Sequence, residues 1–118
     1  MYDKDSLQTT DNGFIFTIKN NIANGNVVEV YLLSLNDDEI PFGDITIKND
    51  NQEMTADNIS IDNPIALRKG VITTFKVKKA NLSDLINKEV KIHMKFKVQV
   101  HESKMTIDFD FSDTLKKN

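Results

Sequence analysis

The stretch Val90-Lys91-Ile92-His93-Met94-Lys95-Phe96-Lys97-Val98-Gln99-Val100 places an apolar residue at every second position. After a short polar break, the same alternation returns over residues 105–111, with apolar Met105, Ile107, Phe109 and Phe111. Successive side chains of a strand point to opposite faces, so strict alternation is typical of strands with one face on a core and one in water. The two runs therefore predict an antiparallel sheet.

The pairing of these two runs follows if a tight turn lies within His101 to Lys104. On the core face, the expected pairs are Val98–Ile107, Phe96–Phe109 and Met94–Phe111. On the outer face, the expected pairs are Lys97–Asp108 and Lys95–Asp110, and opposite charges across a strand pair contribute about 0.2–1 kcal/mol each. This register favours a solvated, cross-paired outer face over an anion-binding row of lysines.

Earlier segments of the chain predict five more strands, over residues 14–19, 27–35, 45–47, 59–61 and 71–78, separated by turn residues. Asn24-Gly25 indicates a hairpin that pairs Ile18 with Tyr31 and Phe16 with Leu33. The alternative is a longer loop that sends these two strands to opposite sheets. The segment 81–87 predicts one helical turn capped by Asn81.

The fold class predicted from these elements is an immunoglobulin-like antiparallel β-sandwich of about seven strands with one short crossover helix. We expect three parts in the chain: a flexible N-terminal segment over residues 1–12, the sandwich domain over 13–113, and a C-terminal tail over 114–118. A chain of 118 residues is long enough for one domain of this kind.

Composition narrows the range of functions. The net charge of −3 argues against a nucleic-acid partner, since phosphate binding needs a basic surplus. The absence of cysteine excludes disulfides, thiolate metal sites and cysteine nucleophiles. Neither a signal peptide nor a transmembrane segment is apparent. We therefore expect no membrane association, and a location in a virion or in the host cytoplasm.

No constellation of residues predicts catalysis, a metal site or a cofactor. Asp108 and Asp110 lie on a strand and lack the glycine-turned loop that calcium ligands need. His93 and His101 would lie roughly 26 Å apart on one extended strand, too far to share a metal or a proton. A lysine cluster at 76–79 is interpreted as protection of an edge strand rather than as a phosphate contact. The sequence thus predicts that the chain is not an enzyme.

Four apolar residues beside turns indicate a possible interface: Ile40, Phe42, Ile65 and Leu67. Exposed apolar side chains in such positions need a cover. We therefore expect a protein partner or self-association rather than a small-molecule partner.

A resemblance adds a functional hypothesis. The stretches 16–21, 28–33 and 63–70, followed by Thr74-Phe75-Lys76-Val77, resemble small sandwich modules in accessory virion proteins of tailed phages: capsid decoration, head-fibre or tail-associated domains. They are also similar to domains of archaeal filament-associated proteins. The resemblance implies a non-catalytic structural or protein-interaction module associated with a virion. The alternatives are a ligand- or carbohydrate-binding module and a regulator that binds a host protein through a sheet edge.

Overall fold

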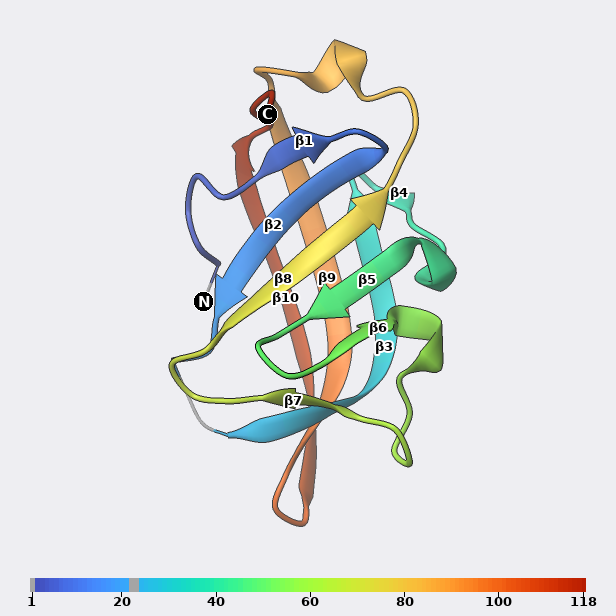
Figure 1. The fold of residues 1–118 in the computed structure, drawn as a ribbon, viewed down its shortest axis with the longest axis vertical. Helices are drawn as coiled ribbons and strands as arrows, with labels where there is room; N and C mark the ends of the chain where they lie inside the picture. The colour runs from blue at the N-terminus through green and yellow to red at the C-terminus, as the bar shows by residue number, and fades with distance from the viewer. Residues whose placement is uncertain (1, 22–23) are drawn as a thin grey trace.

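Two antiparallel sheets, packed face to face, make up the fold (Figure 1). The computed structural model describes residues 2–21 and 24–118, and these contain ten strands, three short 3-10 helices and no α-helix. The prediction of an all-β antiparallel protein is therefore confirmed. Alternation of apolar and polar residues carried that prediction, because only strands present such a pattern to a single core.

The first sheet has the strand order β1-β2-β8-β5-β6. Gly13 opens β2 where that strand pairs with β8. A Cβ atom there would lie 1.7 Å from the carbonyl oxygen of Val77, so only glycine allows the two strands to approach this closely. The strands of this sheet are β1 (Gln8–Thr10), β2 (Gly13–Lys19), β5 (Ile45–Lys48), β6 (Glu53–Thr55) and β8 (Ile72–Lys78).

The second sheet has the order β10-β9-β3-β4, and a further strand, β7, also pairs with β3. Its longest members, β9 and β10, form the hairpin that projects past the other strands at the lower end of Figure 1. The strands of this sheet are β3 (Gly25–Leu35), β4 (Asp38–Glu39), β7 (Ile65–Leu67), β9 (Glu89–Val100) and β10 (Ser103–Thr114).

The core lies between the two sheets and is rich in aromatic rings. Phe16 of β2 stacks on Phe75 of β8 with ring centroids 5.0 Å apart. Its ring also meets Phe111 of β10 edge-on at 5.4 Å, which ties the two sheets together. Such ring pairs contribute about 0.5–1.5 kcal/mol each beyond the area that they bury.

The predicted hairpin around Asn24-Gly25 is wrong, and the alternative is confirmed. Strand β2 lies in the first sheet and β3 in the second, so Phe16 pairs with Phe75 rather than with Leu33. Gly25 itself begins β3 and pairs with Leu67. Local turn chemistry favoured the hairpin, but a sandwich needs connections that cross between its sheets.

The short elements also differ from the prediction. Residues 59–61 form no strand, and Ile61 is 53% exposed. The predicted crossover helix is only a 3-10 turn, η3 (Ser83–Leu85), and Asn81 has a left-handed φ of 64° instead of capping it. The other two turns are η1 (Phe42–Asp44) and η2 (Ala56–Asn58). Strands β1, β4, β6 and β7 were missed because two or three residues are too few to show a period.

The pairing of β9 with β10 differs from the predicted register by two positions. Phe96 lies opposite Ile107, and Lys97 lies opposite Thr106, because the turn is closed by Val100 and Ser103. The predicted pairs of Lys97 with Asp108 and of Lys95 with Asp110 are therefore wrong. A register shift of two positions keeps every side chain on its predicted face of the sheet. The alternation of apolar and polar residues therefore does not distinguish the two registers.

Both ends of the chain take part in this architecture. Leu7 and Leu115 are fully buried in the shared core. The backbone N–H of Thr9 donates to the carbonyl of Lys116 at 2.8 Å, so β1 lies beside the end of β10. The division into 1–12, 13–113 and 114–118 stays a prediction, and these contacts place parts of all three segments around one core.

Candidate functional site

A cleft of about 740 Å³ lies where both ends of the chain meet the end of β8. We call it the terminal cleft. Leu82, Ile86 and Gly13 contribute apolar surface, while threonine, asparagine and serine side chains provide polar groups. Its lining residues are Thr9, Thr10, Asp11, Asn12, Gly13, Asp44, Lys78, Lys79, Ala80, Asn81, Leu82, Ser83, Ile86, Lys117 and Asn118.

Backbone contacts fix the walls of the terminal cleft. The N–H of Lys79 donates to the carbonyl of Asn12 at 3.0 Å, which holds the end of β8 against the turn between β1 and β2. The Lys79 ammonium pairs with Asp38 of the second sheet. The sequence interpretation of these lysines as edge protection is wrong, because β8 lies between β2 and β5. The signal for a cleft was absent from the sequence, since its walls come from distant segments.

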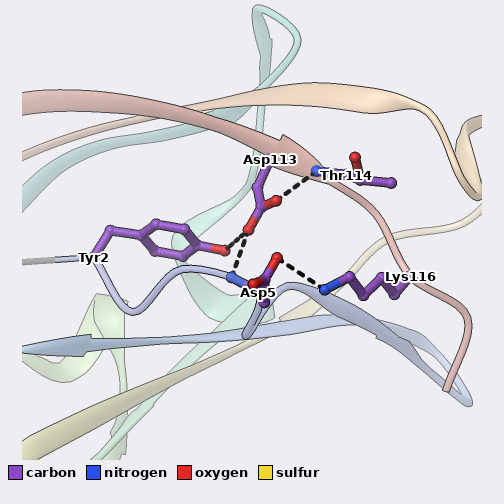
Figure 2. Close-up of polar contacts among 5 residues, drawn as sticks. All are labelled: Tyr2, Asp5, Asp113, Thr114 and Lys116. Atoms are coloured by element: carbon purple, nitrogen blue, oxygen red, sulfur yellow. Dashed lines mark hydrogen bonds and ion pairs between the residues drawn. The ribbon is translucent and has the colours of Figure 1, made fainter.

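A polar cluster joins the N-terminal segment to the end of β10 (Figure 2). The Tyr2 hydroxyl donates to Asp113 Oδ2 at 2.7 Å, and the backbone N–H of Asp5 donates to the same oxygen at 2.8 Å. The N–H of Thr114 donates to Oδ1 at 2.8 Å. Lys116 pairs with Asp5 at 2.9 Å. Sequence reasoning missed this cluster because Tyr2 and Asp113 are 111 residues apart.

The pKa shifts of Tyr2 and Asp113 are typical of a structural contact, which we call the clasp. Burial raises the pKa of Tyr2, and the hydrogen bond to the Asp113 carboxylate raises it further. Burial alone would raise the pKa of Asp113, but the donors Tyr2, Asp5 and Thr114 outweigh it and lower that pKa. The phenol therefore stays protonated and the carboxylate ionised, so neither is poised to exchange a proton near neutral pH.

The four predicted interface residues are split by the fold. Ile40, Ile65 and Leu67 are buried in the core, and Phe42 alone remains 37% exposed. Phe42 begins η1, a turn in which no residue is buried. The interface itself stays a prediction.

Amide side chains of the loop between β5 and β6 hold β7 in place. Asn49 donates from Nδ2 to the carbonyl of Ala66 at 2.8 Å. Gln52 accepts the N–H of Ala66 at 2.8 Å and donates to the carbonyl of Pro64 at 3.2 Å. These bonds fasten β7 to the loop between β5 and β6. Polar loop residues that could have served recognition therefore stabilise the fold instead.

The charged rows of β9 and β10 contact one another. His93 Nε2 lies 2.5 Å from Asp108 Oδ1, and Lys91 Nζ lies 3.3 Å from Asp110 Oδ2. In the described part of the chain, no three His, Cys, Asp or Glu side chains gather in a way that could hold a metal ion. No helix in residues 2–21 and 24–118 is long and apolar enough to cross a membrane.

Comparison with known proteins assigns a family. The family model described as hydroxymethylglutaryl-CoA reductase, N-terminal domain, matches residues 1–116. No curated protein matches the chain. The match overturns the resemblance to phage virion proteins and with it the function as a virion module, its binding-module and regulator alternatives, and the expected virion location.

The same match corrects the prediction that the chain is not an enzyme, because the family is named for a reductase. Short strand motifs such as those at 16–21 and 28–33 occur in many sandwiches, so they carried no information on the family. A match over residues 1–116 takes in nearly the whole sequence instead. The chain belongs to the family of hydroxymethylglutaryl-CoA reductase N-terminal domains.

Proposed function

We propose that the chain serves as the N-terminal domain of a hydroxymethylglutaryl-CoA reductase and that the terminal cleft binds an anionic part of the substrate. The substrate named by the family is a thioester with a free carboxylate and the phosphates of coenzyme A. Such a ligand needs cations and hydrogen-bond donors beside an apolar surface.

One observation carries this proposal: the terminal cleft gathers three lysines in a chain whose net charge is −3. Lys78 and Lys117 are exposed at its rim, and Lys79 is held by Asp38. Asp11 and Asp44 also line it, so the lining side chains carry a formal excess of one positive charge, although Lys79 is paired with Asp38 outside the lining. Leu82 and Ile86 add the apolar surface that an acyl arm could cover.

Isothermal titration of the purified chain with hydroxymethylglutaryl-CoA tests the proposal. We expect saturable binding that weakens about tenfold when Lys78 and Lys117 are both changed to alanine, because two solvent-exposed ion pairs contribute about 0.2–1 kcal/mol each. Lys48→Ala, at the exposed end of β5, is the matched control and should bind like the parent chain. Absence of binding, or equal binding by all three proteins, would contradict the assignment of the cleft.

We also infer that the sandwich is of the immunoglobulin type. The order β1-β2-β8-β5 corresponds to the A-B-E-D order of an immunoglobulin sheet, and β10-β9-β3-β4 corresponds to G-F-C with an added C′ strand. The crossing from β2 to β3 supports the same topology. An experimental structure that placed β2 and β3 in one sheet would contradict it.

A further inference from the structure

We propose that two copies of this chain associate through the free edge of β10, antiparallel and around a two-fold axis at Ile107. Among the described strands, β10 is the last of its sheet and pairs along its length only with β9. An open edge of this kind presents unpaired N–H and C=O groups to another strand.

The edge is open over only part of the strand. Near its end, the Tyr2 ring stacks on Phe111 with centroids 3.6 Å apart, and Asp5 binds Asp113. Beyond that, Lys116 bonds to Leu7 and Thr9 of the N-terminal segment. The part left open is therefore the half nearer the turn, which projects past the first sheet in Figure 1.

Alternate residues of β10 direct their backbone groups to this edge. Leu115 hydrogen-bonds to Asn87 and Lys88, just before β9, whereas the next residue, Lys116, bonds to the N-terminal segment on the other side. Odd-numbered residues of the strand therefore face β9, and even-numbered residues face outward, as antiparallel pairing requires. A partner strand must then place its own even-numbered residues opposite those of β10.

Several registers place even-numbered residues opposite one another, and the charges along β10 distinguish between them. With the axis at Ile107, Lys104 of each copy lies opposite Asp110 of the other, and Thr106 lies opposite Asp108. An axis at Asp108 opposes that residue to itself, and an axis at Phe109 opposes Asp108 to Asp110. An axis at Thr106 pairs Lys104 with Asp108 but brings Glu102 opposite Asp110. Like charges directly opposite each other destabilise a strand pair, so the Ile107 axis is favoured.

The apolar face of the strand agrees with this register. Met105 is 48% exposed, and Ile107 and Phe109 are only partly buried, although all three point to the core side. Pairing at the Ile107 axis puts each Met105 beside Phe109 of the other copy and the two Ile107 side chains together. One continuous apolar row would then cover surface that a single copy leaves in water.

Sedimentation over a concentration series up to about 1 mM, which reaches weak association, measures the dimer directly. Lys104→Glu should oppose a carboxylate to Asp110 of the other copy, and Asp110→Lys should oppose two ammonium groups. We expect each change to raise the dissociation constant of the dimer at least about tenfold. An equimolar mixture of the two variants should associate again, because each mixed pair then has opposite charges.

A backbone variant and a control complete the test. Thr106→Pro removes an N–H that faces outward, so it should abolish the dimer while circular dichroism and the melting temperature show a folded chain. Lys76→Glu, exposed on β8, is the control for charge reversal and should leave association unchanged. A chain that stays monomeric throughout, or a dimer that the edge variants and their mixture do not alter, would overturn the proposal.

Discussion

At the scale of single residues, a hydrogen bond between two side chains joins the N-terminal segment to the end of β10. Tyr2 and Asp113 carry no signal in the sequence, yet their contact connects the first described residue to β10. The carboxylate accepts from a phenol and from two backbone N–H groups. Hydrogen bonds that favour the ionised form lower a carboxyl pKa, so this clasp makes stability depend on pH.

Removing the phenol hydroxyl tests the clasp. Tyr2→Phe should lower the free energy of unfolding by about 0.5–1.5 kcal/mol, since it deletes one hydrogen bond and keeps the ring stacked on Phe111. It should also raise the pKa of the Asp113 carboxyl, which NMR titration can follow. Tyr31→Phe is the matched control and should leave that pKa unchanged. An unaltered Asp113 titration in Tyr2→Phe would show that the donated bond does not act as described.

The sign of the pH dependence follows from the lowered pKa of Asp113. A carboxyl group whose pKa is lower in the folded state stabilises it above the unfolded pKa of about 3.9 and loses this contribution as pH falls through the folded value. Denaturant curves between neutral pH and acid should therefore show a steeper acid loss in the parent chain than in Asp113→Asn. Equal slopes for the two proteins would contradict the linkage.

At the scale of elements, the hairpin of β9 and β10 has one buried strand and one edge strand. Phe96 of β9 is 5% exposed, whereas Phe109 of β10 is only partly buried. Their sequence patterns are alike, so alternation predicts equal burial. Phe96→Ala should cost about 3–5 kcal/mol of stability, and Phe109→Ala clearly less, as urea unfolding can measure. Equal losses would mean that the edge strand is covered.

The register of the same hairpin has its own test. A double-mutant cycle on Lys91 and Asp110, which lie 3.3 Å apart, should give a coupling of about 0.2–1 kcal/mol. The same cycle on Lys97 and Asp108 should give none, because the Lys97 ammonium lies over the Tyr31 ring and Asp108 pairs with His93. Coupling in the second cycle alone would restore the register that the sequence first suggested.

At the scale of the whole molecule, the two ends complete the core between the sheets. Leu7 precedes β1 and Leu115 follows β10, and each is fully buried. Leu7→Ala should therefore destabilise the chain by about 2–5 kcal/mol, the range for a large side chain deleted from a core. Leu115→Ala should behave alike. A loss below about 0.5 kcal/mol, typical of surface positions, would show instead that the first twelve residues are detached.

The amino-acid sequence by itself determined the all-β class, the positions of the longer strands and the face that each side chain occupies. These are local properties, since a period of two is visible within a few residues of one strand. For the connection between residues 14–19 and 27–35, the sequence left two choices: a hairpin within one sheet or a loop between the two sheets. Local turn chemistry at Asn24-Gly25 favoured the hairpin, which is wrong.

Only the tertiary structure decided how those strands meet. The register of β9 and β10, the central place of β8 and the burial of Ile65 and Leu67 all depend on contacts between distant segments. The terminal cleft is of the same kind, because its walls come from both ends of the chain and from the end of β8. Side-chain alternation specifies a face but not a neighbour, so partners separated by a hundred residues leave no local trace in the sequence.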